Sequence, residues 1–226
     1  MYSIIKRLSD FASSTVAILI LSPLLIPILI GLKLTGEGYI FYKQKRIGLK
    51  NKYFNILKFA TMLKDSPNMG TGSITLREDP RITPMGGFLR KTKINELPQI
   101  FNVLKGEMSI VGPRPLVDRT FNAYPNDIQK VVYNSKPGIT GIGSIVFRDE
   151  EKEISEATIP PHDYYAQFIA PYKGALEMWY QNNKSFYTDF MLIFLTAWAI
   201  IVPESDLVYK VFSDLPVRQN VEIQAV

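Results

Sequence analysis

The hydrophobic pattern is dominated by one uncharged stretch near the start of the chain. Residues 11–32, FASSTVAILILSPLLIPILIGL, carry no charged side chain. A helix of about 22 residues reaches about 33 Å, which is enough to cross the hydrocarbon core of a bilayer. The pattern therefore predicts a membrane segment. A cleaved signal peptide is the alternative, and the length of the run and the absence of a small-residue cleavage site at its end disfavour it.

Prolines and flanking charges bear on the topology of this segment. Ser22-Pro23 and Pro27 interrupt its middle, where each proline removes a backbone donor and favours a bend. Cations stand on both sides, so the positive-inside rule gives no preference; they are Lys6, Arg7, Lys33, Lys43, Lys45 and Arg46. A re-entrant helix that breaks at Ser22-Pro23 and returns to the same face satisfies both observations. An ordinary kinked span is the alternative.

The remaining hydrophobic positions form shorter elements. Aromatic and alternating positions predict strands over 39–42 and 53–59, and a helical pattern runs over 175–182. The apolar run 190–202 is short for a membrane span and predicts a buried or interfacial helix. We expect a predominantly helical α+β fold in a single membrane-associated domain with interfacial amphipathic helices. Its parts are a re-entrant helix (1–34), a catalytic region in the same domain (35–203) and a C-terminal tail (204–226).

Composition narrows the chemistry. The 226 residues include no cysteine and one histidine, which excludes disulfides, Cys-ligated metals and His-cluster metal sites. We expect His162 to have a surface or structural role. The net charge of +5 favours anionic partners such as phosphorylated small molecules or an acidic membrane face. Nucleic acid is not expected, because the basic groups flank membrane segments and form no groove-reading element.

Charged residues gather just before a predicted helix in the stretch 90–116. An apolar stripe at i, i+3, i+4 and i+7 predicts that helix, with a proline in its first turn and Gly106 as its stop; the stripe is Leu97, Ile100, Phe101 and Leu104. Arg90, Asn95 and Glu96 precede it, together with two lysines. Such a helix start attracts anions, phosphates especially. A purely structural helix cap is the alternative.

Further candidate residues lie on either side of this stretch. Arg114 stands between Pro113 and Pro115, and a rigidly presented arginine suits bidentate phosphate binding, although a structural turn paired with a carboxylate remains open. Lys58 could point into a site or into solvent. Residues 65–79 predict a mobile loop, either a lid or a linker, and 149–156 an acidic, solvated segment. The cations at 43–46 could meet headgroups or a substrate phosphate. No P-loop or GxGxxG motif occurs.

Several motifs occur in one order along the chain, from about residue 4 to about residue 195. They are a Ser-Pro-broken N-terminal membrane helix, DPRIT, LRKT, NELPQ with NVLKGEMS, VGPRPL and PGITG. In this order the sequence resembles the monotopic bacterial phosphoglycosyl transferases. The resemblance implies transfer of a sugar phosphate from a UDP-sugar to undecaprenyl phosphate, with Mg²⁺ as cofactor and release of UMP. It also implies a monotopic protein among the lipids of the bacterial inner membrane, at the cytoplasmic face, with a homo-oligomer as a possible state.

The resemblance also assigns roles to residues. The family's Asp-Glu dyad, nucleophile and metal ligand, falls on Asn95 and Glu96, and the family's phosphate-contacting arginines fall on Arg90 and Arg114. We add four residues to the phosphate- and substrate-binding set: Lys58, Asp79, Arg81 and Pro113. Many members carry an arginine where this chain has Ala60.

Asn95 departs from the family pattern in a way that matters for the reaction. An amide cannot form the carboxyl-phosphate anhydride that the family's aspartate forms. Three accounts follow: Glu96 becomes the nucleophile, the lipid phosphate attacks directly, or Asn95 is an engineered or inactivating substitution. A catalytically silenced, membrane-anchored binder of a phosphorylated lipid or a nucleotide sugar is the alternative function.

Overall fold

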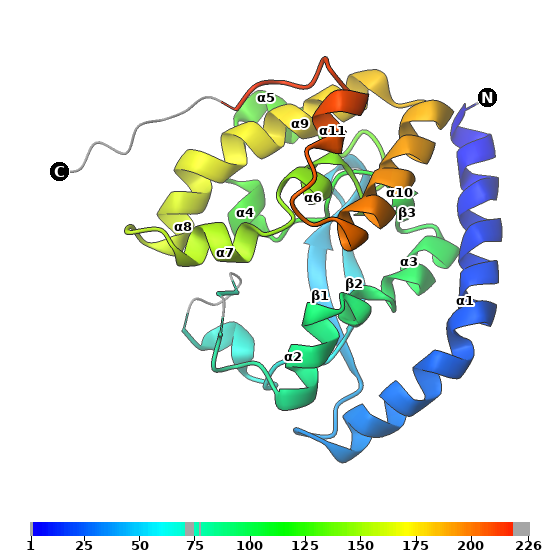
Figure 1. Ribbon diagram of the computed structural model, residues 1–226, viewed down its shortest axis with the longest axis vertical. Coiled ribbons are helices and arrows are strands. Elements are labelled where there is room, and N and C mark those ends of the chain that lie inside the picture. The colour runs from blue at the N-terminus through cyan, green and yellow to red at the C-terminus, as the bar shows by residue number, and fades with distance from the viewer. Residues whose placement is uncertain (1, 71–74, 77, 219–226) are drawn as a thin grey trace.

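The computed structural model of the chain describes residues 2–70, 75–76 and 78–218. Helices predominate and two small sheets lie between them (Figure 1). In chain order the helices and strands are α1 (Tyr2–Leu34), β1 (Phe41–Ile47), β2 (Tyr53–Phe59), α2 (Pro84–Lys91), α3 (Gln99–Lys105), β3 (Ser109–Val111), α4 (Asp118–Phe121), α5 (Asn126–Val131), β4 (Gly138–Thr140), α6 (Ile142–Val146), α7 (Glu150–Ser155), α8 (Pro161–Tyr164), α9 (Ala170–Asn183), α10 (Phe186–Ile201) and α11 (Leu207–Val211). Short 3₁₀ turns η1 (Leu49–Asn51), η2 (Ser66–Asn68) and η3 (Ile94–Glu96) and a π turn η4 (Tyr165–Ile169) connect them. The predicted α+β, mostly helical class is confirmed.

Helix α1 follows one side of the molecule and curves round its lower end (Figure 1). Within the described residues it is the one helix long and apolar enough to cross a membrane, and most of its apolar stretch is not covered by the rest of the chain. Pro23 has no N–H to donate to the carbonyl of Leu19, and the Ser22 hydroxyl donates to that carbonyl instead, at 2.9 Å. Helix α1 therefore continues through the Ser-Pro pair without leaving a bare carbonyl, which in lipid would cost roughly several kcal/mol.

Strands β1 and β2 form an antiparallel hairpin in which Tyr42 pairs with Lys58 and Gln44 with Ile56. The prediction of a strand over 39–42 was wrong in its bounds, because the pairing with β2 extends β1 to Ile47. Lys43, Lys45 and Arg46 therefore lie inside the strand. Since side chains alternate along a strand, Gln44 and Arg46 share one face with Lys58.

Strands β3 and β4 form a second, parallel pair that brings VGPRPL against PGITG. Two glycines make this approach possible. A Cβ on Gly112 would lie 2.3 Å from the carbonyl oxygen of Lys136, and one on Gly138 would lie 2.1 Å from the nitrogen of Gly112. Because the backbones of the two segments are in contact, the β4 segment fixes the position of the segment that carries Arg114.

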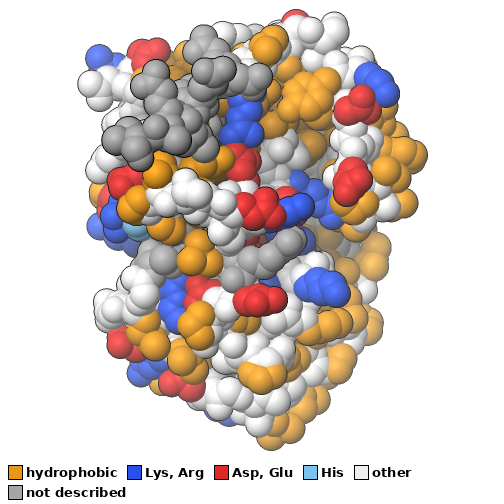
Figure 2. Space-filling model, turned by 60° about the vertical axis from the view of Figure 1, so that its left-hand side comes forward, with side chains coloured by type: hydrophobic (Ala, Val, Ile, Leu, Met, Phe, Trp, Pro, Cys, Tyr) orange, Lys and Arg blue, Asp and Glu red, His pale blue; other side chains and the backbone are white. Residues whose placement is uncertain are grey.

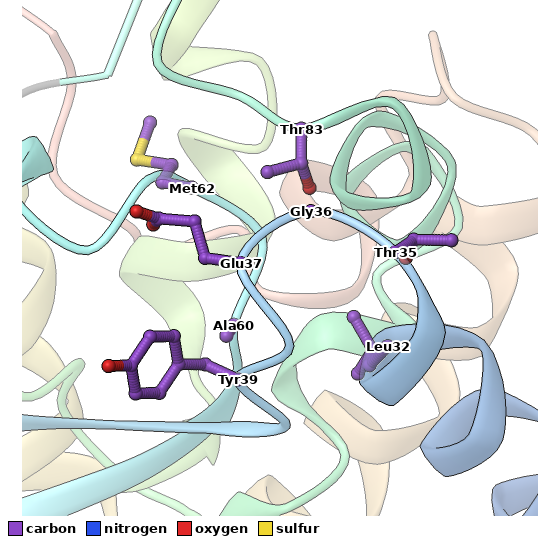
Figure 3. A pocket seen from close by; sticks show the side chains of 8 residues that line it. All are labelled: Leu32, Thr35, Gly36, Glu37, Tyr39, Ala60, Met62 and Thr83. Atoms are coloured by element: carbon purple, nitrogen blue, oxygen red, sulfur yellow. The ribbon is translucent and has the colours of Figure 1, made fainter.

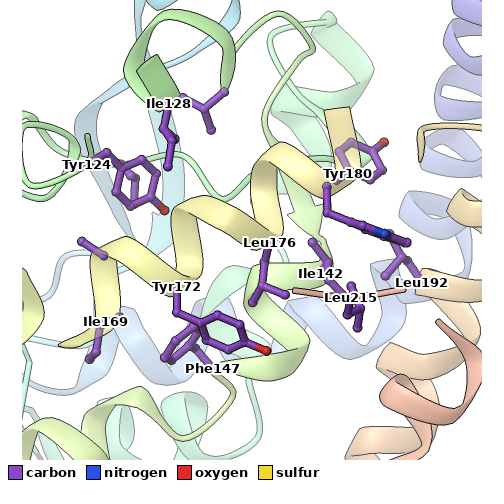
Figure 4. Close-up of a cluster of buried hydrophobic side chains, with 14 of the residues drawn as sticks. Tyr124, Ile128, Ile142, Phe147, Ile169, Tyr172, Leu176, Tyr180, Leu192 and Leu215 are labelled. Atoms are coloured by element: carbon purple, nitrogen blue, oxygen red, sulfur yellow. The ribbon is translucent and has the colours of Figure 1, made fainter. Parts of the chain in front are cut away.

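The main hydrophobic core gathers around α9 (Figure 4). Leu176 and Tyr180 of α9 are buried there with Leu192 of α10. The opposite face of α10 exposes large apolar side chains, namely Phe190, Ile193, Phe194, Ile200 and Ile201, as a helix at a membrane interface would. Part of the C-terminal segment joins the core, since α11 and the residues after it bury Val208, Phe212 and Leu215.

Candidate active site

Glu96 is the centre of a cluster of charged side chains. It lies in the 3₁₀ turn η3, and its Oε1 accepts hydrogen bonds from Lys58 Nζ at 2.7 Å and Arg114 Nη2 at 3.0 Å. Arg114 Nη1 lies 3.5 Å from Oε2. The structure thus brings together Lys58 from a strand, Glu96 from a turn and Arg114 from a loop. All three were predicted from the sequence to belong to one site.

Arg46 is a further member of this cluster that we had not included among the site residues. Its Nε donates to Gln44 Oε1 at 3.0 Å and its Nη1 to the carbonyl of Pro115 at 3.1 Å. The positive charge of Arg114 lies close enough to lower the pKa of Arg46. A sequence prediction that extended β1 to Ile47 and paired it in register with β2 would have found Arg46, because this pairing places Arg46 on the same face as Lys58.

The PRP segment fixes the backbone of Arg114. Tyr133 Oη donates to the carbonyl of Arg114 at 2.8 Å and accepts from the N–H of Leu116 at 2.9 Å. The carbonyl of Pro113 accepts from Gly138 N. Pro113 is buried and acts through the backbone, and the guanidinium of Arg114 stays partly exposed. A rigid backbone with a reachable guanidinium is the arrangement that bidentate anion binding requires.

The electrostatics of the cluster favour charged forms. Burial by itself would raise the pKa of Glu96, but the charges of Arg114 and Lys58 and their hydrogen bonds outweigh burial and hold it well below its usual range. Burial lowers the pKa of Lys58 to about 8 and that of Arg46 to about 10. At neutral pH the cluster therefore holds three cations and one carboxylate, an excess of positive charge that suits a phosphate group.

Asn95 lies beside Glu96 and is buried, with 7% of its surface exposed. Its Oδ1 has no hydrogen-bond partner among the residues that the structure describes. A buried amide oxygen without a partner is costly, by roughly 1–3 kcal/mol. The position is therefore one where a ligand could complete the hydrogen bonding.

Arg90 forms an ion pair with a glutamate, whereas the family resemblance assigns it to a substrate phosphate. Its Nη2 donates to Glu151 Oε1 of the acidic helix α7 at 2.6 Å, an ion pair whose glutamate is 48% exposed. The acidic segment 149–156 is largely exposed, as expected, although Glu150 pairs with Lys173 and Glu153 with Arg218. Helix α7 thus contributes carboxylates that occupy basic groups around the site.

Asp79 and Arg81 form a buried ion pair with each other. Arg81 Nε donates to Asp79 Oδ1 at 2.8 Å, and Arg81 Nη1 donates to the carbonyls of Ser66 and Met69 at 2.9 Å. Both side chains are 3% exposed. The pair holds the loop before α2 in shape, and contact of these two residues with a substrate stays a prediction.

The predicted helix start differs from the structure in one respect. Helix α3 begins at Gln99, so Pro98 is its N-cap and does not lie in its first turn, and Asn95 and Glu96 precede the helix, as predicted, in the turn η3. The seven-residue helix is short, and the partners of Glu96 are side-chain cations. Gly106 ends the helix in the left-handed conformation, as predicted.

A shallow pocket lies near the C-terminal end of α1 (Figure 3). It is lined by Leu32, Thr35, Gly36, Glu37, Tyr39, Ala60, Met62 and Thr83. Ala60 lines this pocket with a small side chain, at the position where the phosphoglycosyl transferases that the sequence resembles often have an arginine. On one face of the molecule, basic and acidic side chains are interspersed across the middle and hydrophobic side chains gather along an edge (Figure 2).

Comparisons with known proteins identify the family. Residues 1–203 match the family model described as bacterial sugar transferase, and the chain belongs to this family. The chain is 33% identical over 210 residues to the exopolysaccharide production protein ExoY of Rhizobium meliloti. It is 32% identical over 212 residues to the undecaprenyl-phosphate galactose phosphotransferase of Salmonella typhimurium. It is 38% identical over 156 residues to the UDP-glucose:undecaprenyl-phosphate glucose-1-phosphate transferase of Xanthomonas campestris.

The matches differ in how much of each protein they cover. They include 86% of this chain and 84% of ExoY, 87% and 40% for the Salmonella protein, and 68% and 32% for the Xanthomonas protein. The chain thus spans less than half the length of the two relatives whose names state a transferase reaction. Residues 1–203, which match the family model, contain α1 and the Glu96 cluster.

Proposed function

We propose that the protein transfers a sugar 1-phosphate from a UDP-sugar to undecaprenyl phosphate, giving a polyprenyl-diphosphate-sugar and UMP, as a first membrane step of surface glycan assembly. The observation that carries the proposal is the Glu96 cluster. Two cations, Lys58 and Arg114, pair with one carboxylate, and Arg46 lies in the same cluster on the carbonyl of Pro115, beside a long apolar helix that can hold the chain at a lipid surface. Cations in this number neutralise a diphosphate and stabilise charge as it moves to the leaving nucleotide.

The test is UMP release by the purified full chain in lipid nanodiscs. With Mg²⁺, undecaprenyl phosphate and a panel of UDP-sugars, at least one sugar should give UMP and a lipid-linked product in equal amounts. UMP release must depend on the lipid phosphate. No UMP from any sugar of a broad panel would refute the active transferase.

The silenced binder is the second candidate, and Asn95 is the observation that favours it. The exchange Asn95→Asp distinguishes the two, because it restores a carboxylate where the family carries its nucleophile. A transferase that is active in its own right should release UMP before the exchange. A silent wild type whose turnover appears only with Asn95→Asp would favour the binder.

Mg²⁺ would find oxygen ligands beside the cluster. Glu96 Oε2 has only a long contact with Arg114, and Asn95 Oδ1 is buried without a partner in the described part of the chain. The described residues hold no group of three or more His, Cys, Asp or Glu residues that could bind a metal by themselves. This donor set fits Mg²⁺, which commonly takes one or two protein oxygens and substrate phosphates. When bound, the ion would neutralise phosphate charge. Chelation should stop UMP release, and Glu96→Gln should weaken Mn²⁺ binding in the presence of UDP, measured by electron paramagnetic resonance.

The membrane topology that we propose is re-entrant, at the cytoplasmic face of the bacterial inner membrane. Both ends of α1 contact the same folded body. Near its start, Arg7 donates to the carbonyls of Val103 and Leu104, each at 2.7 Å. Near its end, Ile28 and Leu32 pack with the core residues Phe59 and Leu89. One body that holds both ends supports a helix whose ends lie on one side of the membrane.

Single cysteines provide the test, since the chain contains none of its own. Ser3→Cys and Lys33→Cys should both react with an impermeant maleimide in inverted vesicles and not in intact spheroplasts. Ser22→Cys should be protected in both. Labelling of position 3 and position 33 from opposite sides would establish a simple span.

A further inference from the structure

The Glu96 cluster contains more positive charge than its one carboxylate can match. Arg46 Nη1 donates to the carbonyl of Pro115, the residue that follows Arg114, and among the described residues its hydrogen-bond partners are this carbonyl and the side chain of Gln44, neither of which is charged. A guanidinium has five N–H donors, so donors remain for a ligand. Two guanidinium groups in one cluster with a single carboxylate are stabilised by a further anion.

The cluster has no side chain suited to act as a nucleophile. Asn95 is an amide. Glu96 Oε1 accepts hydrogen bonds from both Lys58 Nζ and Arg114 Nη2, so two cations hold its electron density. The Nζ of Lys58 is engaged as a donor to Glu96. The phosphate of a polyprenyl phosphate, whose second pKa is about 6, is more basic than such a carboxylate and carries its own attacking oxygen.

We propose that the cluster binds both phosphate-bearing substrates at once, with Arg46 holding the acceptor phosphate, and that transfer occurs in a single displacement with no phosphosugar bound to the enzyme. This inference rests on the proposed transferase function. A phosphate oxygen of the acceptor attacks the phosphorus that carries the sugar, and the bond from that phosphorus to the bridging oxygen of UMP breaks. UMP leaves with the electron pair. Both acceptor and leaving group are phosphate monoester anions, so no proton has to be transferred.

An exchange measurement with the full chain in nanodiscs tests the absence of an intermediate. Radiolabelled UMP and a UDP-sugar are incubated with Mg²⁺ but without polyprenyl phosphate. A single displacement gives no label in the UDP-sugar, whereas an intermediate on the enzyme gives label. Initial rates with both substrates varied should yield intersecting reciprocal plots. Exchange without acceptor, parallel plots, or a sugar-phosphate adduct on the peptide that contains Glu96 would each overturn the inference.

The role of Arg46 has its own readout. Arg46→Gln should raise the KM for polyprenyl phosphate by on the order of tenfold, because a charge-assisted hydrogen bond is worth roughly 1.5–3 kcal/mol, with a smaller change in the KM for the UDP-sugar. Arg119→Gln, on an exposed arginine, is the matched control and should change neither. An equal rise in both KM values, or a rise for the UDP-sugar alone, would remove Arg46 from the acceptor site. A chain that releases no UMP with both substrates present would refute the transferase itself, which is a different outcome.

Discussion

Two glutamates of this protein, the partly buried Glu96 and the fully buried Glu177, lie in opposite electrostatic environments. Glu96 accepts hydrogen bonds from Lys58 and Arg114, and their charges hold its pKa well below the usual range. Glu177, on α9, is 1% exposed, and neither of its oxygens has a hydrogen-bond partner in the described part of the chain. Burial raises the pKa of Glu177 to about 7, although Lys173 opposes the shift.

The difference lies in what the neighbouring cations are bonded to. Lys173 lies one turn before Glu177 on the same helix face but forms its ion pair with Glu150, and Gly143 lies so close to Glu177 that a Cβ there would be 2.4 Å from Oε1. No guanidinium or ammonium group donates to Glu177 in the described chain. Burial without a direct cationic donor therefore favours the neutral form of a carboxyl group. Hydrogen bonds from cations keep such a group ionised.

The largest expected effect is that of Glu96→Gln. The exchange keeps the shape of the side chain but removes the negative charge that holds Lys58 and Arg114 in place. We expect UMP release to fall by about 100-fold or more, in line with the loss of a preorganised charged group at a reaction centre. Folding, followed by size-exclusion profile and circular dichroism, should survive. Glu156→Gln, on an exposed glutamate, is the control, and full activity of Glu96→Gln would remove Glu96 from the mechanism.

Glu177→Gln should alter stability in a pH-dependent way. A carboxyl group whose pKa is raised in the folded state stabilises the fold fully below its unfolded value near 4.5, and this contribution is lost as the pH rises through about 7. The glutamine of the variant stays neutral at every pH, so the variant does not lose this stability as the pH rises. Thermal unfolding should show the variant more stable than wild type at pH 8, by up to about 3 kcal/mol at about 1.4 kcal/mol per pKa unit. The difference should shrink toward pH 5. An equal difference at both pH values would show that the pKa of Glu177 is not raised into this range.

Arg114→Lys should have an intermediate effect on the rate. A lysine keeps the charge but loses the fork that reaches both oxygens of Glu96. We expect kcat/KM for the UDP-sugar to fall by about tenfold, because a bidentate contact becomes a single one. Arg119→Lys, at an exposed position, should change nothing measurable. Unchanged kinetics for Arg114→Lys would mean that only the charge matters at this position.

The sequence allowed the site to be predicted in part, and the differences have physical reasons. The apolar run, the second strand and the proline-flanked Arg114 follow from local rules of hydrophobicity and backbone restriction. The place of Arg46 depends on strand pairing, which the residues of β1 alone do not determine. The mutual ion pair of Asp79 and Arg81 was likewise not predictable, because a sequence motif gives residue types and not their partners.

The ion pair of Arg90 with Glu151 gives the smallest expected effect and tests whether α7 competes with substrate. Arg90 is a phosphate contact by family resemblance, yet its Nη2 is bonded to Glu151 Oε1. An exposed pair of this kind is worth about 0–1 kcal/mol, so Glu151→Gln should lower the KM for the UDP-sugar by about twofold to fivefold and leave kcat unchanged. Because salt screens exposed charges, the difference should narrow as ionic strength rises. Glu156→Gln should leave the KM unchanged at every salt concentration. A KM that does not fall for Glu151→Gln would mean that Arg90 serves α7 and not the donor phosphates, which would confine the functional cations to those that surround Glu96.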